Sequence, residues 1–466
     1  MERVALAMES LYVARLDDHL GDLAHHYRRS DSVTKAVEYL GRAGQQAMQR
    51  SAYADAISSL TAAIDLLQRL PDNPERIQQE LLLQLAVGPA LIAVKGYAAP
   101  ETERAYTRAR ELCERAGDPP ELFPALWGLW VMHAVRGEFR TAYELAEQLL
   151  RRAQKAHDPA LLLYAHFALG NTSFWMGEFV PAREHLEMAS SLYDPERHRP
   201  LAFRYGGFDA GIACLSYAAW TLWTLGYPDQ ALKRGNEALA LAQALSHPLS
   251  LALAEIWVGA LRQSRGEARA TQETAESAMA LSAEHGLTDY LARATTLRGW
   301  AMTEQRHNEE GIALIQEGLA ASRATGSELY RPYFLCLLAE ACTQTGRLDE
   351  GLSALTEALA AANEHEDRHY EPEAHRLKGE LLLKQNDSNT EEAQNCFQRA
   401  VEIARKQSAK SFELRATMSL VRLLAKQGRR DEARTMLAEI YGWFTEGFDT
   451  ADLIDAKALL DELGTV

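Results

Sequence analysis

Residues that are small in most copies, with Trp130 and Val421 as exceptions, recur at a fixed interval through most of this chain, and no other feature restricts its fold as strongly. One series steps by 40, 49, 40, 40, 40, 40 and 42 residues, through Trp130, Gly170, Ala219, Gly259, Gly299, Ala339, Gly379 and Val421. A second steps by 40, 49, 40, 40, 40, 42 and 40, through Ala142, Ala182, Ala231, Thr271, Gly311, Gly351, Ala393 and Ala433. Because both series share one period, the sequence predicts an all-α array of antiparallel helix pairs, an α-solenoid.

The period also predicts how the chain is divided. We expect N-terminal helices over residues 1–73, about nine 40-residue hairpins over 74–440, and a capping helix within 441–466. The step of 49 places an insertion loop at 193–211, with Arg204, Tyr205 and Asp209 as candidate binding residues. Long insertions in repeat arrays often serve binding, and a plain spacer is the alternative.

Composition and charge narrow the functional classes. A net charge of −16 argues against nucleic acid as a partner, because that affinity rests on cations meeting phosphates. We find no apolar run of about 18 residues and therefore expect no membrane span. The first residues lack a basic flank and apolar core, so no secretory signal is expected. Scattered cysteines indicate reduced core residues in a cytoplasmic protein: Cys113, Cys214, Cys336, Cys342 and Cys396.

The small-residue pattern and the glycine at each hairpin turn resemble tetratricopeptide repeats, whose usual unit is about 34 residues. The lengthened unit is similar to the sensor arrays of bacterial signal-transduction ATPases. More specifically, the chain resembles the C-terminal region of bacterial predicted ATPases that also carry class III adenylate/guanylate cyclase domains. The strings that carry this resemblance cover Leu23–Tyr27, Arg204–Asp209, Leu225–Leu232, Arg298–Ala301, Arg331–Tyr333, Arg376–Leu381 and Trp443–Phe448.

The resemblance implies a right-handed superhelix that acts as a sensor or regulatory arm. The catalytic machinery does not carry over, because no Gly-x-x-x-x-Gly-Lys-Ser/Thr phosphate loop and no cyclase domain can be found in the sequence. We therefore expect a non-catalytic module without a cofactor. A separate or lost ATPase or cyclase module is a possible partner, and two alternatives stay open: the chain is a fragment of a larger ATPase or cyclase, or it stands alone.

In that family the first helix of each pair lines the concave groove. Applied here, this register predicts a groove for a protein or small-molecule ligand lined by Trp127, Tyr164, Phe167, Asn171, Trp175, Trp220, Trp223, Trp300 and Tyr333. Exposed aromatic clusters are typical binding hot spots, whereas helical spacing alone would also place such residues in a core. Of the adjacent Phe174 and Trp175, we expect one to be core. The second half of the groove is charged, which we interpret as a solvated face.

One string has the form of a zinc-protease motif. His365-Glu366-Asp367-Arg368-His369 fits His-Glu-x-x-His, a motif that requires both histidines on one helical face. The repeat register places it between two hairpins, so a solvated connector is the favoured interpretation and no metal is expected. Three functions stay open: a ligand-responsive sensor, a constitutive protein–protein scaffold, and, as the least favoured, a zinc hydrolase at His365 and His369. The sequence names neither the ligand nor the oligomeric state.

Overall fold

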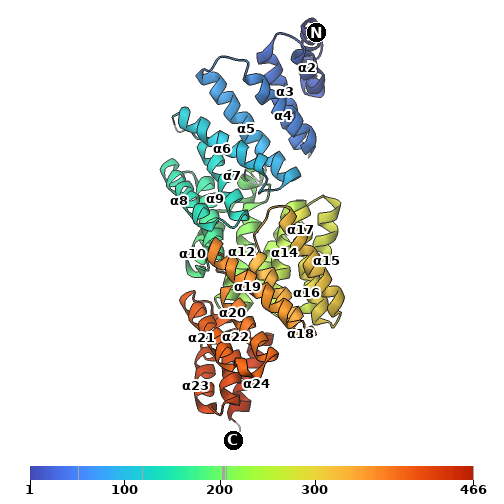
Figure 1. The fold of residues 1–466 in the computed structure, drawn as a ribbon. Coiled ribbons are helices and arrows are strands. Elements are labelled where there is room, and N and C mark those ends of the chain that lie inside the picture. The colour runs from blue at the N-terminus through green and yellow to red at the C-terminus, as the bar shows by residue number, and fades with distance from the viewer. Residues whose placement is uncertain (51, 118, 202–204, 206, 465–466) are drawn as a thin grey trace. The chain divides into compact units, whose positions relative to one another are not determined.

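The regular elements that can be described in the computed structural model are all helices (Figure 1). The structure describes residues 1–50, 52–117, 119–201, 205 and 207–464. The chain divides into two compact units, one of residues 1–135 with 203–207 and one of residues 136–202 with 208–466. The all-α solenoid of helix pairs predicted from the sequence is confirmed.

The first unit is a run of antiparallel helices. They are α1 (Glu2–Leu11), η1 (Val13–His19), α2 (Leu20–Arg28), α3 (Val33–Gln49), α4 (Tyr53–Leu67), α5 (Pro74–Lys95), α6 (Pro100–Arg115) and α7 (Leu122–Val135). By length and composition α5 could cross a membrane, with a mean hydropathy of 1.4, and the sequence expectation overlooked it. In the structure α5 is a repeat helix, packed between α4 and α6, and its Glu80 pairs with Arg108 of α6.

The second unit continues the alternation. Its first half is α8 (Phe139–Ala156), α9 (Pro159–Trp175), α10 (Phe179–Leu192), α11 (Pro195–His198), η2 (Arg199–Leu201), α12 (Ala210–Thr224), α13 (Pro228–Leu245), α14 (Pro248–Ser264), α15 (Ala268–Glu284) and α16 (Thr288–Glu304). The remainder is α17 (Asn308–Ala324), α18 (Arg331–Thr345), α19 (Leu348–His365), α20 (Glu371–Gln385), η3 (Asp387–Asn389), α21 (Thr390–Lys406), α22 (Lys410–Lys426), α23 (Arg430–Tyr441) and α24 (Ala451–Gly464).

The two small-residue series mark where the helices of a pair cross. A Cβ atom built on Gly299 of α16 would lie 2.6 Å from the carbonyl oxygen of Gly311 on α17. One built on Gly170 of α9 would lie 2.7 Å from Cγ of Leu186 on α10. Such distances are too short for a side chain, so the period of small residues is the period of close helix contact.

Candidate functional site

The inner sides of the first helices of each pair do not line an open groove. Every predicted groove residue is at most 5% exposed: Trp127, Tyr164, Phe167, Asn171, Trp175, Trp220, Trp223, Trp300 and Tyr333. Phe174 and Trp175 are both fully buried, although only one was expected in the core. The expected exposure is therefore wrong. In the second unit, later parts of the chain cover Trp175, Trp220 and Trp223. Whether the nine residues bind a ligand remains a proposal.

In the second unit the covering side chains come from helices far along the chain. The Trp220 ring of α12 packs edge-on against Tyr333 of α18 at a centroid distance of 5.0 Å. Tyr333 packs on Tyr370 at 4.9 Å, Tyr370 on Phe412 of α22 at 5.1 Å, and Phe412 on Trp223 of α12 at 5.4 Å. These edge-to-face contacts fill the axis of the array with aromatic rings.

The insertion loop is structural where it can be described. Asp209 is 3% exposed, caps α12 by accepting from the amide of Ile212, and accepts from the Tyr193 hydroxyl at 2.8 Å. Tyr205 is 2% exposed and packs edge-on against Trp127 within the first unit. Arg204 lies outside the described residues. Asp209 and Tyr205 are therefore buried, and their role in binding stays a prediction.

Three successive first helices end on carbonyl groups that accept hydrogen bonds from the last third of the chain. The Trp175 carbonyl at the end of α9 accepts from the amides of Arg368 and His369, at 2.9 and 3.1 Å. At the end of α12, Trp223 accepts from the Ser411 hydroxyl. At the end of α14, Ser264 accepts from the Arg415 guanidinium. Terminal helix carbonyls lack partners in their own helix and carry partial negative charge, so these donors complete them. We call this line of contacts the seam.

The aromatic string Trp443–Phe448 extends the seam to α13. The Glu446 carboxylate accepts from the amides of Asp229 and Gln230 in the first turn of α13, at 3.0 and 3.1 Å. The amide of Gly447 donates back to the Asp229 carboxylate at 3.1 Å. Two strings that carried the resemblance, 225–232 and 443–448, are therefore bound to each other. No repeat spacing in the sequence predicts this contact.

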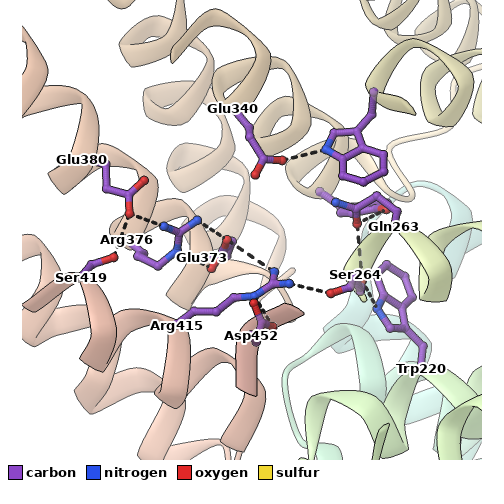
Figure 2. A network of polar contacts seen from close by, with 12 residues as sticks. Trp220, Gln263, Ser264, Glu340, Glu373, Arg376, Glu380, Arg415, Ser419 and Asp452 are labelled. Atoms are coloured by element: carbon purple, nitrogen blue, oxygen red, sulfur yellow. Dashed lines mark hydrogen bonds and ion pairs between the residues drawn. The ribbon is translucent and has the colours of Figure 1, made fainter. Parts of the chain in front are cut away.

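Figure 2 shows a polar network beside the aromatic axis, where a solvated charged face was expected. Arg376 of α20 binds Glu373 at 2.6 Å and Glu380 at 2.5 Å, and Arg415 binds Asp452 of α24 at 2.8 Å. The side chains of Arg376, Glu373 and Arg415 are 11%, 5% and 15% exposed. The solvated interpretation is wrong for these three side chains, because closure of the second unit covers them, whereas Glu304 and Lys384 of the same face are exposed.

Burial and charge act in opposite directions on two carboxylates of this region. Burial raises the pKa of Glu340 to about 7, and the nearby Glu304 adds to the rise, although the Trp300 indole donates a hydrogen bond to Glu340. For Glu373, burial alone would raise the pKa, but Arg376 and Arg415 outweigh it and hold the pKa below its usual value. Glu373 therefore carries charge between two guanidinium groups, whereas Glu340 titrates near neutral pH.

The zinc-protease string does not form a metal site. Helix α19 ends at His365, and Glu366 adopts a left-handed conformation with φ of 57°. Nδ1 of His369 lies 2.6 Å from the Asp367 carboxylate, and its ring packs on Trp175 at 4.6 Å. The helical face that a His-Glu-x-x-His zinc site requires is thus broken between its two histidines. Within the described residues no cluster of three or more metal-ligating side chains is found.

A cavity of about 520 Å³ lies across one end of the seam. One wall is the turn from α9 to α10, residues 176–181, and the other is formed by Arg368, Glu371 and the end of α21. Gln407 connects the walls: its Nε2 atom donates to the Arg368 carbonyl at 2.8 Å, and a Cβ atom on Gly177 would lie 2.3 Å from that Nε2. No local pattern in the sequence indicates this cavity, because its walls lie more than 180 residues apart along the chain.

A protein-family model described as anaphase-promoting complex subunit 5 matches residues 207–265, 302–370 and 380–460. A curated relative, an uncharacterized protein of Rhizobium meliloti (strain 1021), is 26% identical over 417 residues, which are 88% of this chain and 40% of the relative. The chain thus spans well under half the length of that relative.

Among solved structures, a Rap protein complexed with competence and sporulation factor is similar, with a TM-score of 0.54 and 12% identity. The match covers 85% of this chain and 99% of the Rap chain. At this identity the likeness concerns the fold. It supports the tetratricopeptide-like helical repeat architecture of this chain.

Proposed function

We propose that this chain is a non-catalytic regulatory module that responds to ligands by opening and closing its seam. As in the ATPase and cyclase relatives that its sequence resembles, it would act as the sensor arm of a signalling system. A match to only 40% of the Rhizobium relative supports a role as one part of a longer protein. The stacked hairpins form a stiff array, and the seam has two alternative states, open and closed.

The observation that carries this proposal is the polar character of the seam. Its donors complete the carbonyls of Trp175, Trp223 and Ser264, and each of those carbonyls sits at a helix end. Exchanging such a bond for water changes the free energy by only about 1 kcal/mol, so polar contacts of this kind form a reversible latch. Helix-pair contacts such as α16 on α17 are instead tight and apolar and would persist on opening.

Opening would uncover the aromatic axis. Trp220, Tyr333 and Phe412 would lose their mutual contacts, and each large ring exposed costs roughly 2 kcal/mol. A partner that offers an apolar face to these rings would repay that cost and hold the open state. Five of the predicted groove residues would then bind the partner in the open state: Trp175, Trp220, Trp223, Trp300 and Tyr333.

The test joins a thermal-shift screen of short peptides and metabolites to hydrogen exchange at the seam. Each compound that raises the melting temperature is added at saturation, and exchange is measured at the amides of Arg368, His369 and Gly447. A sensor predicts that binding changes exchange at all three amides and leaves the α16–α17 amides unchanged. Binding without any change at the seam contradicts it. No small-molecule hit, together with a protein that stays bound and an unchanged seam, would instead favour the constitutive scaffold.

A further inference from the structure

Building on the proposed seam, the geometry points to a specific ligand site in the 520 Å³ cavity, and we propose that it binds a short zwitterionic peptide with apolar side chains. The volume lies within the range of roughly 300 to 1,000 Å³ that is typical of small-molecule sites. Its two walls belong to opposite sides of the seam, residues 176–181 and 368–408. A ligand in contact with both walls favours the closed state.

Two cations in the cavity call for an anionic group. Arg368 and Lys406 line it, both are exposed, and neither has a carboxylate within ion-pair distance in the described part of the chain. Arg399, the third cation, already lies 3.5 Å from Glu402. A carboxylate that reaches Arg368 and Lys406 would form charge-assisted hydrogen bonds, which are about twice as strong as neutral ones.

Acceptors in the same cavity call for a donor. The Oε1 atom of Gln407 is buried and has no hydrogen-bond partner among the described residues. Glu371 also lines the cavity, and burial raises the pKa of its carboxyl against the opposing pull of Arg368, Arg399 and Lys406. An unpaired buried acceptor is rare in folded proteins, and a ligand N–H group would satisfy it. A peptide amino terminus offers such donors with a positive charge.

The apolar part of the lining selects the side chains. Val180, which is 45% exposed, lines the cavity together with Pro181 and Ile403. These apolar groups share the lining with the cations and the acceptors, so a ligand with charged ends and an apolar body matches its composition. A short apolar peptide with both termini free carries all three features, whereas a simple organic acid lacks the donor.

The test is calorimetric titration of the intact chain with apolar di- and tripeptides, Leu-Leu and Leu-Leu-Leu among them. We expect one-to-one binding that acetylating the amino terminus or amidating the carboxyl terminus weakens at least about tenfold. Free leucine separates a peptide from an amino-acid ligand. No binding by any of these peptides at millimolar concentration overturns the assignment.

Two variants locate the site. Arg368→Gln and Lys406→Gln should each weaken binding at least about tenfold, because each removes one charged contact to the carboxylate. Arg368 contributes to the seam through its main-chain amide, so its substitution leaves that contact in place. Arg269→Gln is the matched control, since Arg269 is 88% exposed and pairs with Glu273 away from the cavity. Equal binding by Arg368→Gln, Lys406→Gln and the control overturns the assignment.

Hydrogen exchange separates this inference from the proposed function. If the peptide binds with the expected specificity, saturating peptide should slow exchange of the Arg368 and His369 amides. If the peptide binds specifically but exchange at the seam is unchanged, the proposed regulatory function is overturned and the peptide site stands. If the seam responds to other ligands but no peptide binds, the peptide site is overturned and the proposed regulatory function stands.

Discussion

Glu446 and Asp229 cap each other's segments across more than 200 residues of chain. The Glu446 carboxylate accepts from the Asp229 amide at 3.0 Å, and the Asp229 carboxylate accepts from the amide of Gly447, next to Glu446, at 3.1 Å. The exchange resembles a capping box, with one half supplied by a distant loop. Since α13 has no side-chain cap of its own, its first turn depends on the seam.

Glu446→Ala should therefore act on α13. Loss of a cap costs about 1 kcal/mol, and exchange at the Asp229 and Gln230 amides should rise by the corresponding factor of roughly five. Asn73→Ala is the control, because Asn73 caps α5 by accepting from the Arg76 amide at 2.9 Å in the first unit. Hydrogen exchange in both variants checks the prediction, and unchanged α13 amides in Glu446→Ala would contradict it.

Two glycines form a matched pair for testing the close approach at the seam. Gly447 and Gly428 both have positive φ, 76° and 82°. A Cβ atom on Gly447 would lie 2.0 Å from Cγ of Pro228, whereas one on Gly428 meets no described atom within 4 Å. We expect Gly428→Ala to cost about 1 kcal/mol for its backbone conformation.

Gly447→Ala should cost the same conformational energy and, in addition, about 1 to 3 kcal/mol for overpacking. Urea unfolding curves of the two variants provide the measurement. Equal losses of stability would mean that Gly447 does not lie against Pro228 in solution.

How much the sequence reveals depends on how far apart the interacting residues lie. The helix pairs were predictable because each pair has two residues that approach closely where its helices cross. Gly299 and Gly311, twelve positions apart, are one example. The register also identified which side chains turn inward, Trp220 and Tyr333 among them. These inward-facing side chains are buried and do not line an open groove, because the second unit closes on itself. Whether an array closes depends on small rotations between hairpins, summed over many repeats.

The seam left no local pattern to find. Arg415 meets Ser264 and Glu446 meets Asp229 only because the second unit folds back, and neither pair has a spacing that the period explains. The one signal present was that two unusual strings, 225–232 and 443–448, belong to the same array. A single sequence does not show that such strings touch.

Trp223→Ala distinguishes a core role from an exposed groove position. The ring is 2% exposed, packs on Phe412 at 5.4 Å and lies under the Arg415 guanidinium at 5.1 Å. Removing it should cost about 3 to 5 kcal/mol, as for other buried aromatic residues. Trp443→Ala is the comparison, because that ring is 36% exposed and should cost less. If thermal melting of Trp223→Ala stays close to that of the parent, the ring lies open to solvent.

Arg415→Met tests the polar side of the seam. The change removes the donor to Ser264 and leaves Asp452 without its ion pair, so we expect a loss of about 2 to 4 kcal/mol. Adding Asp452→Asn should recover part of that loss, because the unpaired charge disappears. Arg429→Met, in an exposed pair with Glu432, should cost less than about 0.5 kcal/mol. Denaturant unfolding of these variants measures the coupling, and purely additive losses for Arg415 and Asp452 would contradict it.

The pKa of Glu340 makes stability depend on pH near neutrality. Its folded value of about 7 lies above the usual 4.5, so between these values the folded chain holds a proton that the unfolded chain has released. Its contribution to stability is therefore complete below pH 4.5 and is lost as the pH rises through 7. In Glu340→Gln the amide oxygen still accepts from Trp300, but the titration is gone.

The stability of Glu340→Gln relative to the parent should therefore grow by about 3 kcal/mol from pH 4.5 to pH 8. Subtracting the two unfolding free energies at each pH removes the titrations that both proteins share. Glu304→Gln should move the transition to lower pH, because Glu304 adds to the rise in the pKa of Glu340. A difference that stays constant with pH would mean that Glu340 is ionised throughout this range, and closure of the second unit would then not bury its carboxylate.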